Sequence, residues 1–301
     1  MSHENFIMEL FSYCRPMGSE TEREFVCKYL VPAGFVEDEH HNMILTVGDK
    51  PRILFSSHMD TVHRKDGRQN LLLKDGILTL HPDEKSSCLG GDDTAGIWLM
   101  LEMIKAGIEG DYIIHYGEER GGIGSSAKAR AEPGFFAGID IAIAFDRAGY
   151  TDVITHQGMR TASDAFAKSL AKELGSGYKP CPHGIYTDTY EYAHLVPECT
   201  NISVGYSHAH SPREEQDVTF LIALREALLQ VDWKNLVVER DPLLVASEKF
   251  TFRDFQRGPQ TLEDLCWEYP EVAATMIAAA GWSAANFVEE AESNFGIQLA
   301  A

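Results

Sequence analysis

The chain has 301 residues, 44% hydrophobic and 24% charged, a composition typical of a soluble globular protein with a sizeable core. Its 46 acidic and 26 basic residues give a formal charge of −20, which would repel the phosphates of a nucleic acid and an anionic membrane surface. The first residues carry no cationic segment followed by an apolar run, and no stretch is apolar over the roughly 18 residues that a membrane helix needs. We therefore expect a cytoplasmic protein that binds neither nucleic acid nor membrane.

The six cysteines are scattered and include no C-x-x-C pair. This spacing favours neither a thiolate zinc site nor a disulfide framework. We expect free, buried thiols.

A helix signal opens the N-terminal part. Ser19 and Glu22 have the spacing of a capping box, and the apolar side chains of residues 25 to 30 follow on the predicted helix. This helix should precede the first strand.

Short apolar runs between polar or glycine-rich segments then predict strands. They cover residues 43–47, 53–55, 112–116, 139–145 and 201–206. The clearest helical pattern between them has Ile97, Met100, Leu101 and Ile104 at offsets of 0, 3, 4 and 7. Alternating strands and helices predict an α/β fold with a mixed central sheet flanked by helices on both faces. A polar insertion at residues 74–78 has the features of a small hairpin.

The C-terminal part predicts a separate unit. An amphipathic helix at about residues 220–231 would close a catalytic domain of residues 1–239, and Asp241-Pro242 marks a break. Residues 240–301 would form a linker and an accessory hairpin of two helices from about Thr261 onward. Its Trp267 and Trp282 would dock on the main domain or on a second subunit, which leaves a homo-oligomer open.

Side chains of metal-ligand type follow five of these apolar or glycine-rich segments. They are His58 with Asp60, Asp92 with Asp93, Glu118 with Glu119, Asp146, and His210. Each alone has an ordinary explanation, such as an acidic pair at a helix start. Together, in one sheet, they would repel one another strongly unless cations neutralised them. Histidine and carboxylate without thiolate suit two zinc ions, with manganese or cobalt as substitutes.

These motifs resemble those of a known family. The segments 58–62, 91–96, 117–119, Asp146 and 210–212 are similar, in matching order, to the co-catalytic zinc exopeptidases. That family includes tripeptide aminopeptidase, glutamate carboxypeptidase, the acylamino-acid hydrolases and the leucyl-type zinc aminopeptidases. The resemblance runs from about His58 to Glu215.

The resemblance implies a role for each ligand. His58 and Asp146 would bind one zinc, Glu119 and His210 the other, and Asp92 would bridge the two. His208 is a rival of His210, but the pattern His-Ser-Pro-x-Glu favours His210.

The resemblance also assigns the surrounding groups. Asp60 would accept the other ring N–H of His58 and fix its tautomer. Glu118 would be the general base, taking a proton from water between the metals and passing it to the departing amine. The peptide between Asp92 and Asp93 is often cis in this family.

Asp188 and Arg160 are candidates for contact with the substrate. Thr187-Asp188 resembles a segment that walls the substrate pocket in zinc aminopeptidases, but Asp188 could equally be a helix cap. Arg160 could bind a substrate carboxylate, although an isolated arginine is more often a surface charge.

Only 63 residues (147 to 209) separate Asp146 from His210. The carboxypeptidase-like members insert a lid of about a hundred residues there, so we expect a lidless catalytic domain. An aminopeptidase acting on a small peptide or aminoacyl-amide is therefore favoured. The alternatives are a carboxypeptidase or N-acyl-amino-acid amidohydrolase, and a non-catalytic metal-binding protein.

Overall fold

The structure is a computed structural model in which residues 2–245 are described. The hairpin expected after Thr261, with Trp267 and Trp282, lies outside the described residues, as does Cys266. The proposed division at residue 239 therefore stays a prediction.

The N-terminal part contains one helix that the sequence analysis did not predict. Helix α1 (His3–Phe11) buries Ile7, Leu10 and Phe11, which have offsets of 0, 3 and 4. The two-residue strand β1 (Tyr13–Cys14) follows it and pairs with β5 (Gly67–Arg68).

The predicted capped helix begins next. It is α2 (Glu20–Phe25), continued by η1 (Val26–Leu30) and α3 (Val31–Ala33). Ser19 Oγ accepts from the backbone N–H of Glu22, as a capping box requires, but the Glu22 carboxylate accepts from Gly18 instead of Ser19.

The central sheet has eight strands in the order β13-β10-β14-β9-β4-β8-β3-β2. The bounds are β2 (Val36–Glu37), β3 (Met43–Val47), β4 (Ile53–His58), β8 (Gly110–His115), β9 (Ile141–Arg147), β10 (Asp152–Ile154), β13 (Lys179–Cys181) and β14 (Glu198–Ser203). Strands β8, β4, β9 and β14 run parallel, whereas β3 pairs antiparallel with β8, and β10 with β14. The predicted mixed sheet is confirmed.

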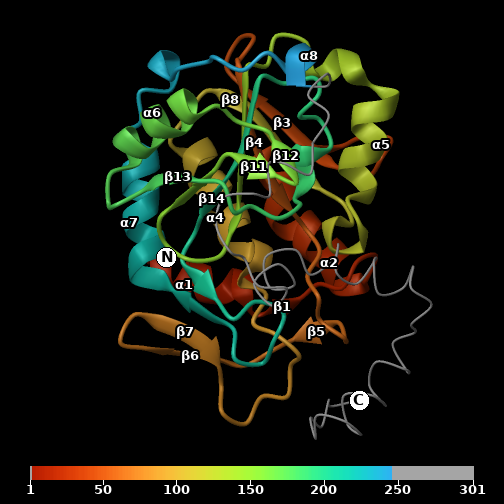
Figure 1. Cartoon of the computed structure of the whole chain (residues 1–301). Helices are drawn as coiled ribbons and strands as arrows, with labels where there is room; N and C mark the ends of the chain where they lie inside the picture. The colour runs from red at the N-terminus through yellow and green to blue at the C-terminus, as the bar shows by residue number, and fades with distance from the viewer. Residues whose placement is uncertain (1, 246–301) are drawn as a thin grey trace, which may run out of the picture. The chain divides into compact units, whose positions relative to one another are not determined.

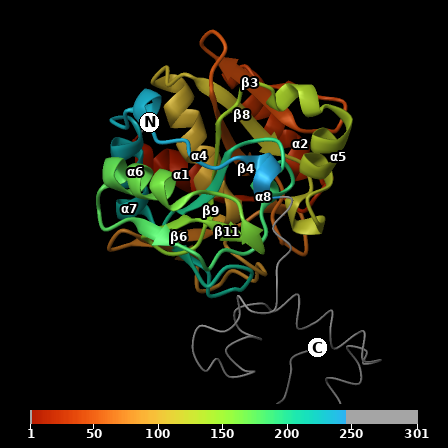
Figure 2. The same cartoon turned by 45° about the horizontal axis from the view of Figure 1, so that its top comes forward.

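Helices cover both faces of this sheet (Figure 2). Alternate strand residues face opposite sides, so Phe55 and Tyr112 pack in one core, and Leu54 and Ile113 in the other. The first core is covered by α1, α4 (Gly91–Lys105), α6 (Asp164–Leu174) and α7 (Val218–Leu228). The second is covered by α5 (Ile123–Ala131), η3 (Pro133–Phe136) and the segment after η4 (Asp188–Tyr190).

Helix α4 is buried on more sides than its predicted apolar stripe implied. Ile97, Met100 and Leu101 are buried, but so are Trp98 and Met103 between them. Because α1 and α7 pack against α4 while the sheet lies beneath it, little of the helix faces solvent.

A second sheet, in the order β15-β16-β7-β6, lies apart from the first (Figure 1). It contains the predicted hairpin, β6 (Leu71–Lys74) and β7 (Ile77–Leu80), joined at Asp75-Gly76, both with positive φ. Strands β15 (Tyr206–Ser207) and β16 (Glu215–Asp217) complete it.

The predicted strand at residues 201–206 is wrong in one respect, because the chain divides it between the two sheets. Strand β14 ends at Ser203, and Gly205, with φ of +88°, turns the chain toward β15. A Cβ at Gly205 would lie 2.5 Å from the Phe220 ring, so the turn requires glycine.

The 63 residues between Asp146 and His210 are built into the main body. They form β10, β11 (His156–Gln157), β12 (Met159–Arg160), α6, β13, η4, β14 and β15. The short helices η2 (Glu118–Arg120), η5 (Trp233–Asn235) and α8 (Pro242–Val245) complete the described chain. Within residues 2–245, no helix is long and apolar enough to cross a bilayer.

The five described cysteines are free thiols. Cys14, Cys88 and Cys199 are buried as expected, but Cys27 is exposed on η1 and Cys181 is half-buried.

Candidate metal centre

The neighbouring ends of three parallel strands bring the predicted ligands to one edge of the sheet. His58 is the last residue of β4, and Asp146 lies near the end of β9. After β8, Gly117 adopts a left-handed conformation with φ of 70°, which turns the chain so that Glu118 and Glu119 follow.

A first group of donor atoms gathers around His58. Its Nε2 lies 2.8 Å from Asp92 Oδ1 and 3.7 Å from Asp146 Oδ1. One ligand atom from each of the three residues lies within 4.8 Å of the others. His58 is 1% exposed, so this group is enclosed.

A second group shares Asp92 with the first. His210 Nε2 lies 3.1 Å from Asp92 Oδ2 and 3.0 Å from Glu119 Oε1, and the three donor atoms again lie within 4.8 Å. The rival His208 is exposed, and the structure brings only His210 into the group. Thus the two oxygens of Asp92 face different histidines.

Glu118 lies beside both groups. Together with His58 and Glu119 it forms a third set of donor atoms within 4.8 Å. The residue is partly buried, and its carboxylate lies among these donor atoms.

Asp60 is placed differently from the expectation. The closer acceptor for His58 Nδ1 is the backbone carbonyl of Asp60, at 2.9 Å, while Oδ1 is 3.5 Å away. The carboxylate instead accepts from the backbone N–H groups of Glu118 and Glu119, at 3.1 and 3.3 Å. Asp60 thereby ties the end of β4 to the turn after β8.

Glu214 is a positioning residue whose role the sequence analysis missed. Its buried carboxylate accepts from the backbone N–H groups of four consecutive residues, at 2.8 to 3.2 Å: Leu89, Gly90, Gly91 and Asp92. It is the glutamate of the His-Ser-Pro-x-Glu pattern, which had served only to choose His210. Glu214 therefore joins the loop that carries His210 to the loop that carries Asp92.

Asp146 has its own set of supporting contacts. Its Oδ2 accepts from Thr187 Oγ1 at 2.8 Å, and its Oδ1 from Tyr206 Oη at 3.3 Å. The side-chain amide of Asn201 bonds both the backbone N–H and the carbonyl of Asp146. No sequence pattern singled out these contacts, which join separate parts of the fold.

Asp93 fastens the start of α4 to the end of β4. Its carboxylate accepts from Ser57 Oγ and from the backbone N–H groups of His58 and Gly96. A Cβ at Gly96 would lie 2.5 Å from Asp93 Oδ1, so only glycine allows this approach. The peptide bond between Asp92 and Asp93 is cis.

Arg15 is a buried cation whose charge interacts with Asp60 and Asp93. Arg15 is fully buried and donates to the Met59 carbonyl at 2.8 Å and to Thr94 Oγ1 at 2.9 Å. It therefore holds the segment after β4 against the first turn of α4, and its charge offsets part of that of Asp60 and Asp93.

The two candidate substrate residues have different surroundings. Asp188 is buried at the first position of η4, and its carboxylate interacts with the charges of His58 and Asp146. Arg160 instead donates to Asp164 Oδ1, at 2.9 Å, on the first turn of α6. The structure thus brings Asp188 close to the donor groups, whereas Arg160 bonds to Ala162 and Asp164 on and before α6.

Several carboxylates lie close together at the edge of the sheet that holds the donor groups. Burial raises the pKa of Glu118 to about 10, opposed by His58 and reinforced by the carboxylates of Asp146 and Asp188. Burial also raises the pKa of Asp146 to about 6, with Asp92 adding to the effect. Divalent cations would favour the ionised forms and offset this repulsion.

The donor set fits such cations. Each group supplies one imidazole and two carboxylates, with no thiolate, which suits zinc and also accepts manganese or cobalt. Asp188 Oδ1 is buried without a hydrogen-bond partner, as expected for an acid beside a cationic centre. The donor groups therefore fit bound metal, and Asp92 belongs to two of them.

The same fold occurs in solved peptidase structures. Aminopeptidase PepT from Bacillus cereus is 17% identical, with a TM-score of 0.62 over 77% of this chain and 97% of that one. A tripeptidase from Staphylococcus aureus is 17% identical, with a TM-score of 0.58 over 76% of this chain and 96% of that one. An aminopeptidase from the archaeon Desulfurococcus kamchatkensis is 15% identical, with a TM-score of 0.55 over 83% and 98%. No family model and no curated protein sequence matches the chain.

Proposed function

We propose that the chain is a two-zinc exopeptidase that hydrolyses the terminal amide bond of a peptide, with aminopeptidase activity favoured. The observation that carries this proposal is the pair of three-residue donor groups sharing Asp92, with Glu118 beside them. The aminopeptidases and the tripeptidase among the solved structures of this fold support the same reaction class.

The residues that would hold the cations follow from the two groups. His58 and Asp146 would bind one, Glu119 and His210 the other, and Asp92 would bridge them. When bound, the two cations would polarise the substrate carbonyl and favour deprotonation of a water molecule.

Glu118 is the proposed general base. It lies within the donor groups yet is not needed as a ligand, so its carboxylate is free to take a proton from water and return it to the leaving amine. The bonds from the backbone N–H groups of Glu118 and Glu119 to Asp60 would hold the base and the neighbouring ligand in fixed orientation.

The negative charge around the site favours recognition of the substrate's amino terminus. The charge of two divalent cations would be neutralised by Asp92, Glu119, Asp146 and a hydroxide. The electrostatic field around the site would then depend on the remaining acidic residues. Asp60, Glu118 and Asp188 lie close by, and the whole chain carries −20. At long range this field attracts an ammonium group.

The alternatives are a carboxypeptidase or N-acyl-amino-acid amidohydrolase, and a metal-binding protein without catalysis. Arg160, the residue that the sequence offered for the carboxylate contact of the first, is paired with Asp164. A general base with no ligand role argues against the second.

Glu118→Gln tests the proposal. The amide keeps the shape of the side chain but does not accept the proton, so turnover of free-amine peptides should fall at least about 100-fold with zinc content unchanged. The matched control is Glu39→Gln, an exposed acid in the turn between β2 and β3, which should behave as the parent. Equal activity of Glu118→Gln and the parent, both with full zinc content, would remove Glu118 from the mechanism.

A further inference from the structure

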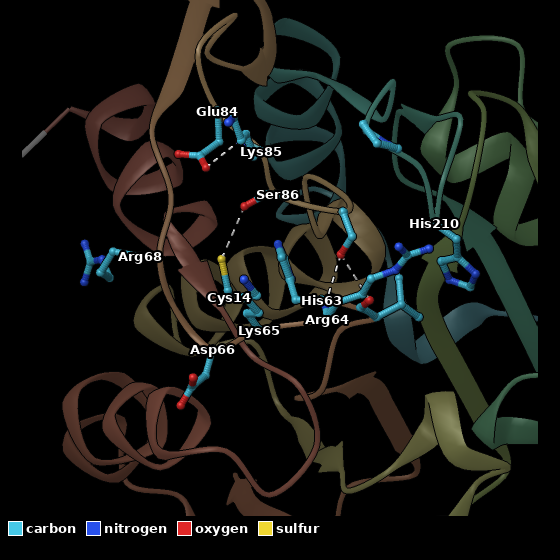
Figure 3. A pocket seen from close by; sticks show the side chains of 13 residues that line it. Cys14, His63, Arg64, Lys65, Asp66, Arg68, Glu84, Lys85, Ser86 and His210 are labelled. Carbon is cyan, nitrogen blue, oxygen red and sulfur yellow. Dashed lines mark hydrogen bonds between the residues drawn. The ribbon is translucent and has the colours of Figure 1, made fainter. Parts of the chain in front are cut away.

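A large pocket opens beside the second donor group. Its volume is about 720 Å³, within the usual range of small-molecule sites, and His210 and Pro212 form part of its wall. The other lining residues come from β1 and from the segments on either side of the β6-β7 hairpin: Cys14, Val62, His63, Arg64, Lys65, Asp66, Arg68, Glu84, Lys85, Ser86 and Ser87. Figure 3 shows these side chains, with Arg64 reaching toward His210.

The pocket is locally positive although the chain is strongly acidic. Four lining residues are Arg or Lys and two are Asp or Glu, so the formal charge is +2 (4 − 2), against −20 for the chain. His63 adds no charge near neutral pH, because burial lowers its pKa to about 4. The lining of this pocket therefore carries a net positive charge within an acidic chain.

Three of the four cations are free to meet a ligand. Arg68 is engaged, with its guanidinium 2.9 Å from Glu9 and above the Tyr13 ring. Arg64, Lys65 and Lys85 have exposed side chains, and none forms an ion pair with another residue of the described range 2–245.

The position of Arg64 is fixed by its backbone. Its N–H donates to Ser87 Oγ at 3.0 Å, which joins the chain after β4 to the chain before α4. The guanidinium is thus presented from an anchored segment, and the wall opposite it carries the histidine of the second donor group.

We propose that this pocket binds a carboxylate of the peptide substrate, on the part of the peptide away from its amino terminus. The inference rests on the proposed peptidase function and narrows its substrate class to short peptides with an acidic group. The acids around Glu118 would hold the substrate ammonium, and Arg64, Lys65 and Lys85 would hold the carboxylate. The substrate's amine would be attracted to the metal centre and its carboxylate to the pocket. A short zwitterionic peptide would therefore be oriented by both charges.

The carboxylate has two sources, the free C-terminus of a short peptide or an acidic side chain. Two peptide pairs separate them: Leu-Gly-Gly against its C-terminal amide, and Leu-Glu-Gly-amide against Leu-Gln-Gly-amide. A higher kcat/KM for Leu-Gly-Gly than for its amide would identify the C-terminus as the bound carboxylate. A higher kcat/KM for Leu-Glu-Gly-amide than for Leu-Gln-Gly-amide would identify the side chain. For one exposed contact to each of two of these cations, we expect a preference of about 2- to 30-fold.

The double variant Arg64→Gln/Lys65→Gln tests whether the pocket causes the preference. Its acid-to-amide ratio of kcat/KM should fall toward one. The matched control is Lys168→Gln/Lys172→Gln, which removes the same charge from exposed positions of α6 and should keep the parent ratio. Added NaCl should lower kcat/KM more for the acid peptides than for the amides in the parent and in the control, but not in the pocket variant.

Two results would overturn the inference. One is equal hydrolysis of acid and neutral members of both pairs by the parent enzyme. The other is an acid preference that survives unchanged in the pocket variant. In both cases the peptides are still cleaved, so the proposed peptidase function stands, whereas loss of that function would show as no hydrolysis of any of the four peptides.

Discussion

Replacing Glu214 with glutamine keeps the shape of the side chain but removes one of its two acceptor oxygens. Each oxygen of Glu214 accepts from two backbone N–H groups of the loop before α4, so the amide nitrogen would face two donors whichever way it points. Hydrogen bonds to a charged group contribute about 1.5–3 kcal/mol each, so losing two costs about 3–6 kcal/mol.

One effect opposes this loss. Burial raises the pKa of Glu214 to about 7, even though the N–H groups of Gly90, Gly91 and Asp92 act in the other direction, so the ionised side chain is itself costly to bury. A neutral glutamine avoids that cost. We therefore expect the free energy of unfolding to fall by about 2–4 kcal/mol, which lowers Tm by about 4–16 °C in a protein of this size.

The assay has two readouts, Tm by calorimetry and the zinc Kd by titration against a chelator. Because the loop carries Asp92, the Kd should weaken by about 10- to 100-fold. Glu215→Gln is the matched control, since Glu215 is the next residue and its carboxylate accepts from Ser207 Oγ instead of from the loop before α4. If Tm and Kd of Glu214→Gln equal those of this control, the carboxylate does not hold the loop in the way described.

Three further outcomes are expected. Asp60→Asn should weaken zinc affinity or activity about 10- to 100-fold, because one oxygen that holds the turn after β8 is lost; an unchanged metal titration would make Asp60 a passive acid. Peptides with a free amine should be cleaved faster than their N-acetylated forms, and the reverse preference would favour the amidohydrolase alternative. Although burial acts in the other direction, hydrogen bonds from Tyr29, Lys28 and Arg68 lower the pKa of Glu9 from 4.5 to about 2. Its stabilisation is therefore complete above about pH 4.5 and lost as pH falls to about 2, so the Tm difference between parent and Glu9→Gln should shrink from about pH 6 to about pH 3, and a constant difference would contradict this assignment.

The sequence could predict the fold and the donor positions because both depend on local pattern. Apolar runs of strand length marked β3, β4, β8 and β9, and the ends of neighbouring parallel strands must lie at one edge. His58 and Asp146 therefore followed from periodicity together with residue type.

The supporting contacts could not be predicted in the same way. Glu214 reaches residues 122 to 125 positions earlier in the chain, and Arg15 reaches Met59 and Thr94. Such bonds depend on how loops meet after the sheet has formed, and no spacing in the sequence encodes them. The division of residues 201–206 between two sheets was missed for a related reason, since the run itself does not show that Phe220 packs against the turn at Gly205.

The unequal exposure of the two histidines implies unequal exchange. His58 is 1% exposed at the end of a central strand, whereas the His210 side chain is 49% exposed on a loop outside the central sheet. A cation in the His210 group would meet solvent directly and leave through a single loop movement, while one in the His58 group would require the sheet edge to open. Dialysis against a weak chelator should then remove the metal in two phases, so that a half-loaded protein with its remaining cation at His58 can be isolated and compared with the fully loaded form.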